Sequence, residues 1–165
     1  MSVKVTKIFI YTMISLPKLN FPSVNLHAVE DKGRTLVFDR VRSTYVVLTP
    51  EEWVRRHLVE FLLSHCKAPL RSVVEEYPIA LNSMAQRADV VVLDGAAQPL
   101  LLAECKSAEV DLSVESVKRE VFMQATRYNA VLGAKYVLLT NGLHHFCFEH
   151  RESGYISMTS FPRLG

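Results

Sequence analysis

The sequence predicts an α/β domain in which a central mixed β-sheet is flanked by helices, in the order αβββαβ. Two apolar runs, residues 90–93 and 100–103, are separated by a short turn-forming stretch, which is typical of a β-hairpin. Two stretches with apolar residues at helical spacing, 50–65 and 113–132, lie on either side of this hairpin. A third apolar run, residues 135–140, follows the second stretch, and a helical connection predicts that it lies parallel to the hairpin's second strand.

The first helix has a clear beginning. Thr49 can cap it, Pro50 suits its first turn, and Glu51 and Glu52 favour the positive end of the helix dipole. The stretch then carries an apolar stripe at helical spacing, formed by Trp53, Val54, His57, Leu58, Phe61 and Leu62. We therefore expect the helix to end near residue 65.

The remaining elements follow from apolar runs and turn residues. Residues 36–39 and 45–48 bracket a polar connection and predict a hairpin. Residues 72–79 predict a strand that Pro78 places near an edge or an end of the sheet. Ser113 opens the second helix, Gly133 ends it, and an Asn141-Gly142 turn predicts a hairpin between residues 135–140 and 144–148.

Length and composition favour one domain. The chain has 165 residues, of which 49% are hydrophobic and 22% charged, and its net charge of +2 neither requires nor excludes a nucleic-acid partner. We expect residues 36–165 to form a single domain and residues 1–35 to be an N-terminal extension or an extra strand. The apolar run 8–16 is too short to span a bilayer and no small-residue cleavage site follows it, although Met13 is an alternative start.

Three widely separated cysteines, an odd number, favour reduced thiols in a cytoplasmic protein over a disulfide framework. A zinc site lacks the usual close pair of cysteines. Its only ligands would be Cys105, Cys147, His144 and His145.

The hairpin brings three charged residues together. If it is symmetric about Ala96 and Ala97, Asp89 lies opposite Glu104, and side-chain alternation places Lys106 on the same face. Two carboxylates about 5 Å apart repel, so a divalent metal ion or protonation of one acid must offset the repulsion.

Two acids and a lysine are suited to metal-assisted phosphodiester hydrolysis. Oxygen ligands hold Mg²⁺ or Mn²⁺, which lowers the pKa of a bound water, and a lysine ammonium can stabilise the charge of the transition state. The alternative is that Asp89, Glu104 and Lys106 are simply charged strand ends that reach solvent. The apolar runs before Glu104 and after Asp89 favour the catalytic interpretation.

The chain resembles the PD-(D/E)xK nuclease superfamily, with Asp89 as the motif aspartate and Glu104-Cys105-Lys106 as its second half. Within it, the chain is most similar to the N-terminal nuclease domain of type I restriction enzyme R subunits, over residues 49–148. Ala88 stands where the superfamily's name has proline. The resemblance implies a restriction-endonuclease-like core and a Mg²⁺- or Mn²⁺-dependent DNA endonuclease.

The resemblance also implies roles for individual residues. Asp89, Glu104 and the Cys105 carbonyl would hold the metal, with a helix glutamate as a further ligand. Glu51 fits the family's opening best, although Glu52 and Glu60 stay open, and helix-terminal charge is the alternative for all three.

Gln124 and Tyr128 lie four residues apart, on one helix face, and resemble a Gln-x-x-x-Tyr motif of RecB-like members. Gln124 would then orient a phosphate or a water, and Tyr128 would contact the nucleic acid. The alternative is a core stripe that includes Tyr128, with Gln124 at its border.

DNA is the expected partner, and some of the scattered basic residues could form a rim that follows its phosphates. They are Arg40, Arg42, Arg55, Arg56, Arg87, Lys118, Arg119 and Arg127. The chain has no Gly-x-x-x-x-Gly-Lys-Ser/Thr phosphate loop, so a helicase or methyltransferase subunit is a further expected partner. A homodimer is one way to cut both strands, although no interface signature is visible. The alternatives to a nuclease are a nucleic-acid-binding module that does not cut and a purely structural subunit.

Overall fold

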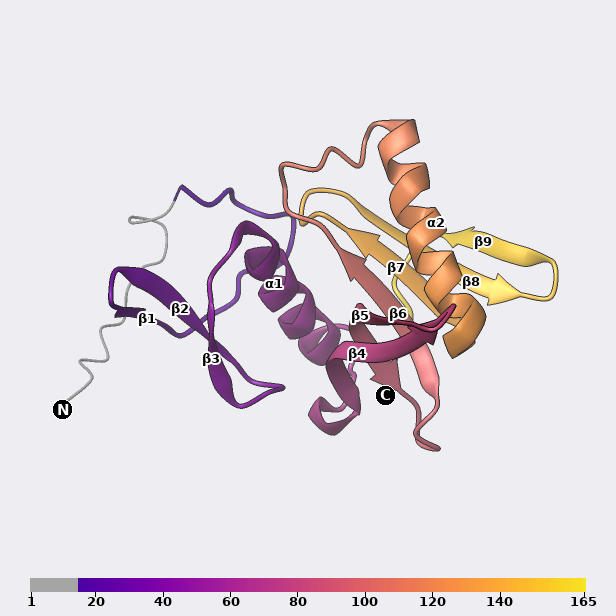
Figure 1. The fold of residues 1–165 in the computed structure, drawn as a ribbon, viewed down its shortest axis with the longest axis horizontal. Coiled ribbons are helices and arrows are strands. Elements are labelled where there is room, and N and C mark those ends of the chain that lie inside the picture. Colours follow the sequence, from indigo (N-terminus) through magenta and orange to yellow (C-terminus); the bar gives the residue numbers. More distant parts are fainter. Residues whose placement is uncertain (1–14) are drawn as a thin grey trace.

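The computed structural model describes residues 15–165, and these form two β-sheets and two long helices (Figure 1). The strands of the larger sheet, in spatial order, are β4 (Val73–Leu81), β5 (Met84–Leu93), β6 (Pro99–Cys105), β7 (Tyr136–Thr140), β8 (His145–Arg151) and β9 (Gly154–Met158). Neighbouring strands are antiparallel except for β6 and β7, which are parallel. The predicted mixed sheet and its parallel pair are therefore confirmed, whereas β9 was not predicted.

Helix α1 (Pro50–Ser64) begins as its sequence predicts. The Thr49 side chain accepts a hydrogen bond of 3.0 Å from the backbone N–H of Glu52, and Pro50 occupies the first turn. Helix α2 (Glu115–Leu132) begins later than predicted, because the Ser113 side chain is bound to Asp111 in a preceding turn and does not cap the helix. Gly133 ends α2 with a φ of +67°, a conformation that favours glycine.

The two helices lie on opposite faces of the larger sheet. Val90 and Ala103 pack in the core cluster that contains the apolar residues of α1. Their neighbours Val91 and Leu102 pack instead with Tyr128 of α2. Because successive strand residues point to opposite faces, this alternation places the sheet between a layer formed by α1 and a layer formed by α2.

A smaller sheet lies beside α1 and contains β1 (Ala28–Asp31), β2 (Arg34–Asp39) and β3 (Thr44–Val47), in that order (Figure 1). The hairpin of β2 and β3 is confirmed, and β1 adds to it a strand from residues 1–35, which were expected to be an extension or an extra strand. The apolar run 8–16 and the alternative start at Met13 lie largely outside the described residues. Within the described residues, no helix is long and apolar enough to cross a membrane.

Strand β4 changes faces in its middle. Glu75 lies on the α1 side, where it forms an ion pair with Arg56, whereas Ile79 packs against Tyr128 of α2. Regular alternation would keep residues 75 and 79 on the same face. Between them Glu76 has a φ of +50°, which is uncommon for a residue other than glycine. We infer that the irregular backbone at Glu76 turns the remainder of β4 toward α2. Pro78 lies in this part of β4, which is an edge strand as predicted.

Candidate active site

Asp89 lies where β5 changes faces together with β4. In the register of the two strands, Glu75 is paired with Val90 and Tyr77 is paired with Ala88. Asp89 is therefore the residue opposite Glu76. Val90 packs on the α1 side, whereas Ala88 packs with Tyr128 on the α2 side. Asp89 therefore occupies the junction between the two layers, where side chains from both helices can reach it.

The hairpin register also brings Asp89 next to Glu104. Val90 is paired with Ala103, and one further step along this register places Asp89 opposite Glu104. Asp89 Oδ2 accepts a hydrogen bond of 2.8 Å from the backbone N–H of Cys105. The predicted convergence of the two acids is thus present, although a register shift between Val92 and Leu93 makes the turn itself asymmetric.

Glu104 is an acid in an unusual environment. Its side chain is almost fully buried, and among the described residues its Oε1 atom has no hydrogen-bond partner. Burial and, after it, the negative charge of Asp89 together raise the pKa of Glu104 to about 9. Without a bound cation Glu104 therefore holds a proton at neutral pH. The unpartnered oxygen beside a second carboxylate fits a divalent cation, which would satisfy Oε1 and allow Glu104 to ionise.

Lys106 begins a chain of hydrogen bonds that leads along α2. Its Nζ donates to Gln124 Oε1, Gln124 Nε2 donates to the Tyr128 hydroxyl, and that hydroxyl donates to Gln86 Oε1, each over 3.3 Å. Gln124 is thus connected to the site through Lys106. Tyr128 is both a member of this chain and part of the apolar core on the α2 side, so both sequence interpretations of it have support. Gln86 was not predicted, because it lies three residues before Asp89 on a part of β5 that the sequence did not identify as a strand.

Of the helix glutamates, Glu51 is the one that interacts with the strand acids. Burial and then the charge of Asp89 raise the pKa of Glu51, whereas the charge of Lys106 acts to lower it. Glu60 lies further along α1 and forms a 2.8 Å ion pair with Arg40. Glu52 points into a separate network of arginines. The geometry therefore favours Glu51 over Glu52 and Glu60 as a further ligand.

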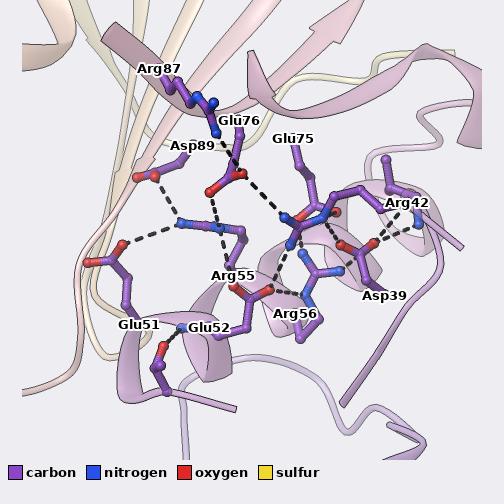
Figure 2. A network of polar contacts seen from close by, with 12 residues as sticks. Asp39, Arg42, Glu51, Glu52, Arg55, Arg56, Glu75, Glu76, Arg87 and Asp89 are labelled. Atoms are coloured by element: carbon purple, nitrogen blue, oxygen red, sulfur yellow. Dashed lines mark hydrogen bonds and ion pairs between the residues drawn. The ribbon is translucent and has the colours of Figure 1, made fainter. Parts of the chain in front are cut away.

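Arg55 enters the site from α1 and binds Asp89 directly. Its Nη2 donates to Asp89 Oδ1 over 3.1 Å and to Glu51 Oε1 over 3.4 Å (Figure 2). Burial lowers the pKa of Arg55, but the charges of Asp89 and Glu52 raise it by more, so the guanidinium is a permanent cation. Arg55 is one of the basic residues of which some were expected to form a phosphate-binding rim, and its buried position leaves it out of that subset.

Cys105 contributes through its backbone. Its N–H group binds Asp89, while its thiol packs in the core on the α1 side and burial raises the thiol's pKa. The thiol is therefore unsuited to metal binding. The three cysteines are all free and buried, as expected for reduced thiols, and a zinc site is not supported because Cys147 contacts Met158 while His145 bonds Thr140 and Asn20.

A second group of acids lies beside Arg55 (Figure 2). Oxygen atoms of Asp39, Glu52 and Glu75 all lie within 4.8 Å of one another and are buried. Arg56 forms ion pairs with all three, including one of 2.7 Å to Asp39 and one of 2.8 Å to Glu52, and Arg42 adds a further cation. Two arginines already balance these acids, so the group is a structural ion-pair network and does not fit a metal ion.

This network was not predicted. Positions 52, 55, 56 and 59 lie on one face of α1 at helical spacing, and the first three of them are charged. A charged stripe next to an apolar stripe is also typical of a surface helix, so nothing in the sequence indicates that this stripe is buried. Arg42 and Arg56, like Arg55, point into this network, so they do not belong to the subset of basic residues that could form a phosphate-binding rim.

Comparisons with known proteins agree with this description. The model of the family described as type I restriction enzyme R protein N terminus matches residues 50–162. Comparison with curated proteins finds no match. Among solved structures, a fragment of a putative HsdR subunit of a type I restriction enzyme from Vibrio vulnificus YJ016 is similar, with a TM-score of 0.53 and 19% identity over 71% of this chain. This chain covers 24% of that fragment, and at this identity the likeness supports the fold alone. On the family match, the chain belongs to the type I restriction enzyme R protein N-terminal family.

Proposed function

We propose that this chain is a metal-dependent deoxyribonuclease that hydrolyses phosphodiester bonds of DNA in a restriction-related process. The observation that carries the proposal is the buried, unpartnered carboxylate of Glu104 beside Asp89. A buried glutamate with an unpartnered oxygen beside a second carboxylate is destabilising unless a cation or a proton intervenes, which supports a cation-binding role for Glu104. Membership of a restriction-enzyme family supports the same conclusion.

Asp89, Glu104 and Glu51, with the Cys105 carbonyl oxygen, would hold Mg²⁺ or Mn²⁺. When bound, such an ion supplies a Lewis acid and an activated water at neutral pH. Lys106 would stabilise the negative charge that develops on the phosphoryl group. Gln124 accepts a hydrogen bond from the Lys106 ammonium and would fix its direction, while its own amide and Tyr128 would contact the DNA backbone.

The wider assignment follows from the family. Residues 36–165 would form the nuclease-like domain and residues 1–35 its extension, in a cytoplasmic protein. A helicase or methyltransferase subunit would be a further partner that delivers the DNA. A homodimer would provide two sites for the two strands.

The test is cleavage of duplex and single-stranded DNA with Mg²⁺ or Mn²⁺ by the wild type and by the variants Asp89→Ala and Lys106→Ala. We expect both variants to lose cleavage while their circular dichroism spectra stay native. The exposed residues Asp31 and Lys135 provide the matched controls Asp31→Ala and Lys135→Ala, which should cut normally. Cleavage by Asp89→Ala at the wild-type rate would remove Asp89 from the mechanism.

One observation favours a second function, that of a DNA-binding module that does not cut. Both carboxylate oxygens of Asp89 already accept hydrogen bonds, one from Arg55 and one from Cys105. If these two bonds leave Asp89 unable to bind a metal ion as well, the fold would bind DNA without hydrolysis. This function predicts salt-dependent DNA binding that no divalent ion converts into cleavage.

A further inference from the structure

Four carboxylates surround Arg55, which lies in the candidate active site. Its guanidinium donates to Asp89 and Glu51 on the side of the strand acids and to Glu52, over 3.2 Å, on the other side. Glu76, the residue at which β4 changes faces, lies 3.8 Å from Arg55 Nη1. The side chain of Arg55 is only 8% exposed, so it cannot turn away into solvent without breaking several contacts.

We propose that Arg55 takes the place of a second metal ion, so that the site binds a single divalent cation. This inference rests on the proposed function, because it specifies how many ions the same carboxylates hold. Phosphodiester hydrolysis can use two metal ions about 4 Å apart that share carboxylates. Here the guanidinium already bridges Asp89 and Glu51, which are the acids that would share a second ion.

The charges of the site are consistent with one ion. Asp89, Glu104 and Glu51, the acids that would contact the ion, supply three negative charges when ionised, and Arg55 and Lys106 supply two positive ones. Glu52 and Glu76 are left out of this count because they also pair with Arg42, Arg56 and Arg87. One divalent ion then leaves about one excess positive charge, which a phosphodiester group would neutralise, whereas two ions would leave about three. A second ion would also lie within a few ångströms of a permanent guanidinium cation, and the two would repel.

The surroundings of Arg55 hold it in this position. Glu52 is shared between Arg55 and Arg56, and Arg56 is fixed in turn by Asp39 and Glu75 (Figure 2). Because these groups lie on three different elements, α1, β2 and β4, displacing Arg55 would leave buried acids unpaired. We expect an incoming ion to leave Arg55 in its place.

The experiment is a calorimetric titration of the metal-free protein with Mn²⁺, without DNA, which measures the number of ions bound per chain. The variants are Arg55→Gln, which removes the cation, and Arg55→Lys, which retains it. Arg40→Gln is the matched control, because Arg40 is an exposed arginine that pairs with Glu60 of the same helix. Paramagnetic resonance of the bound Mn²⁺ distinguishes single ions from coupled pairs.

We expect one Mn²⁺ per chain in the wild type, in Arg55→Lys and in Arg40→Gln, and two per chain with a coupled-pair spectrum in Arg55→Gln. Two ions in the wild type would overturn the inference and leave the proposed function intact. A single ion with weaker binding in Arg55→Gln would also overturn it, since Arg55 would then only orient Asp89. If Arg55→Gln does not fold, the number of Mn²⁺ ions bound by the wild type and their resonance spectrum still show whether the site holds one ion or two. Absence of Mn²⁺ binding by the wild type would overturn the proposed metal site itself.

Discussion

Replacement of Glu104 by glutamine should stabilise the metal-free protein at neutral and alkaline pH. Burial and the nearby charge of Asp89 raise the pKa of Glu104 in the folded protein far above its ordinary value of 4.5. In the unfolded chain the same carboxyl ionises as the pH passes its ordinary pKa. Above that pH, folding must return a proton to Glu104, and stability falls. Glutamine has the shape of the protonated acid but no proton to lose, so Glu104→Gln removes this dependence.

The size of the effect follows from the two pKa values. The contribution of the protonated Glu104 side chain to the free energy of unfolding is fully present below pH 4.5 and is lost progressively as the pH rises toward about 9. Each pH unit in this window corresponds to about 1.4 kcal/mol of unfolding free energy. At neutral pH the free energy of unfolding of Glu104→Gln should therefore exceed that of the wild type by up to roughly 3 kcal/mol. At acidic pH the two free energies should be nearly equal.

The assay is urea unfolding in the presence of a chelator, at several pH values between about 5 and 8, followed by circular dichroism. The exposed residue Glu109 provides the control Glu109→Gln, which should follow the wild type at every pH. Adding Mg²⁺ should raise the stability of the wild type, because the ion binds only the folded protein, and should raise that of Glu104→Gln much less. A wild-type stability that does not fall with pH relative to Glu104→Gln would refute the reasoning about this carboxyl.

Three further predictions concern the framework of the site, and urea unfolding measures each of them. Asp39→Ala should lower the free energy of unfolding by about 3–5 kcal/mol, because Arg56, which is 2% exposed, loses its partner at 2.7 Å. A decrease of less than about 1 kcal/mol would show that Arg56 does not depend on Asp39. Thr49→Ala should lower the free energy of unfolding by about 1 kcal/mol, because it removes the cap of α1, whereas Thr49→Ser, which keeps the hydroxyl, should retain most of the stability. Gly133→Ala should cost about 1 kcal/mol because of the φ of +67°, whereas equal stability would mean that the end of α2 rearranges freely.

Local sequence signals predicted most of the elements. The cap at Thr49, the glycine at residue 133 and the apolar runs of the central hairpin each act within a few residues, so they could be recognised without knowledge of the fold. The meeting of Asp89 with Glu104 was predictable for the same reason, because a short hairpin fixes its own register. Strand β9 was missed because its residues are half-exposed on an edge and show little apolar alternation.

Contacts between distant segments could not be predicted in the same way. The network of Asp39, Arg56 and Glu75 joins residues from β2, α1 and β4, and nothing in the spacing of these residues indicates that they meet. Arg55 shows the same difficulty. Its charge suggested a surface residue that contacts DNA, whereas the packing of α1 against the sheet directs it to Asp89. A charged residue on a helix that is buried on two sides has no solvent to reach, so it must find a partner inside the protein.

The change of faces at Glu76 and Asp89 explains how the site combines groups from both layers. In a regular strand, Asp89 would point to one layer only and could meet residues from one helix. Here Arg55 reaches Asp89 from α1, while Lys106, two residues after Glu104 on the adjoining strand, is bound to Gln124 of α2. The uncommon backbone of Glu76, with its φ of +50°, is stabilised by the arginines that surround its side chain, Arg42, Arg55 and Arg87. The ion-pair network and the irregular strand thus support each other, and together they hold Asp89 between the layers, where its carboxylate lies close to Glu51 and Glu104.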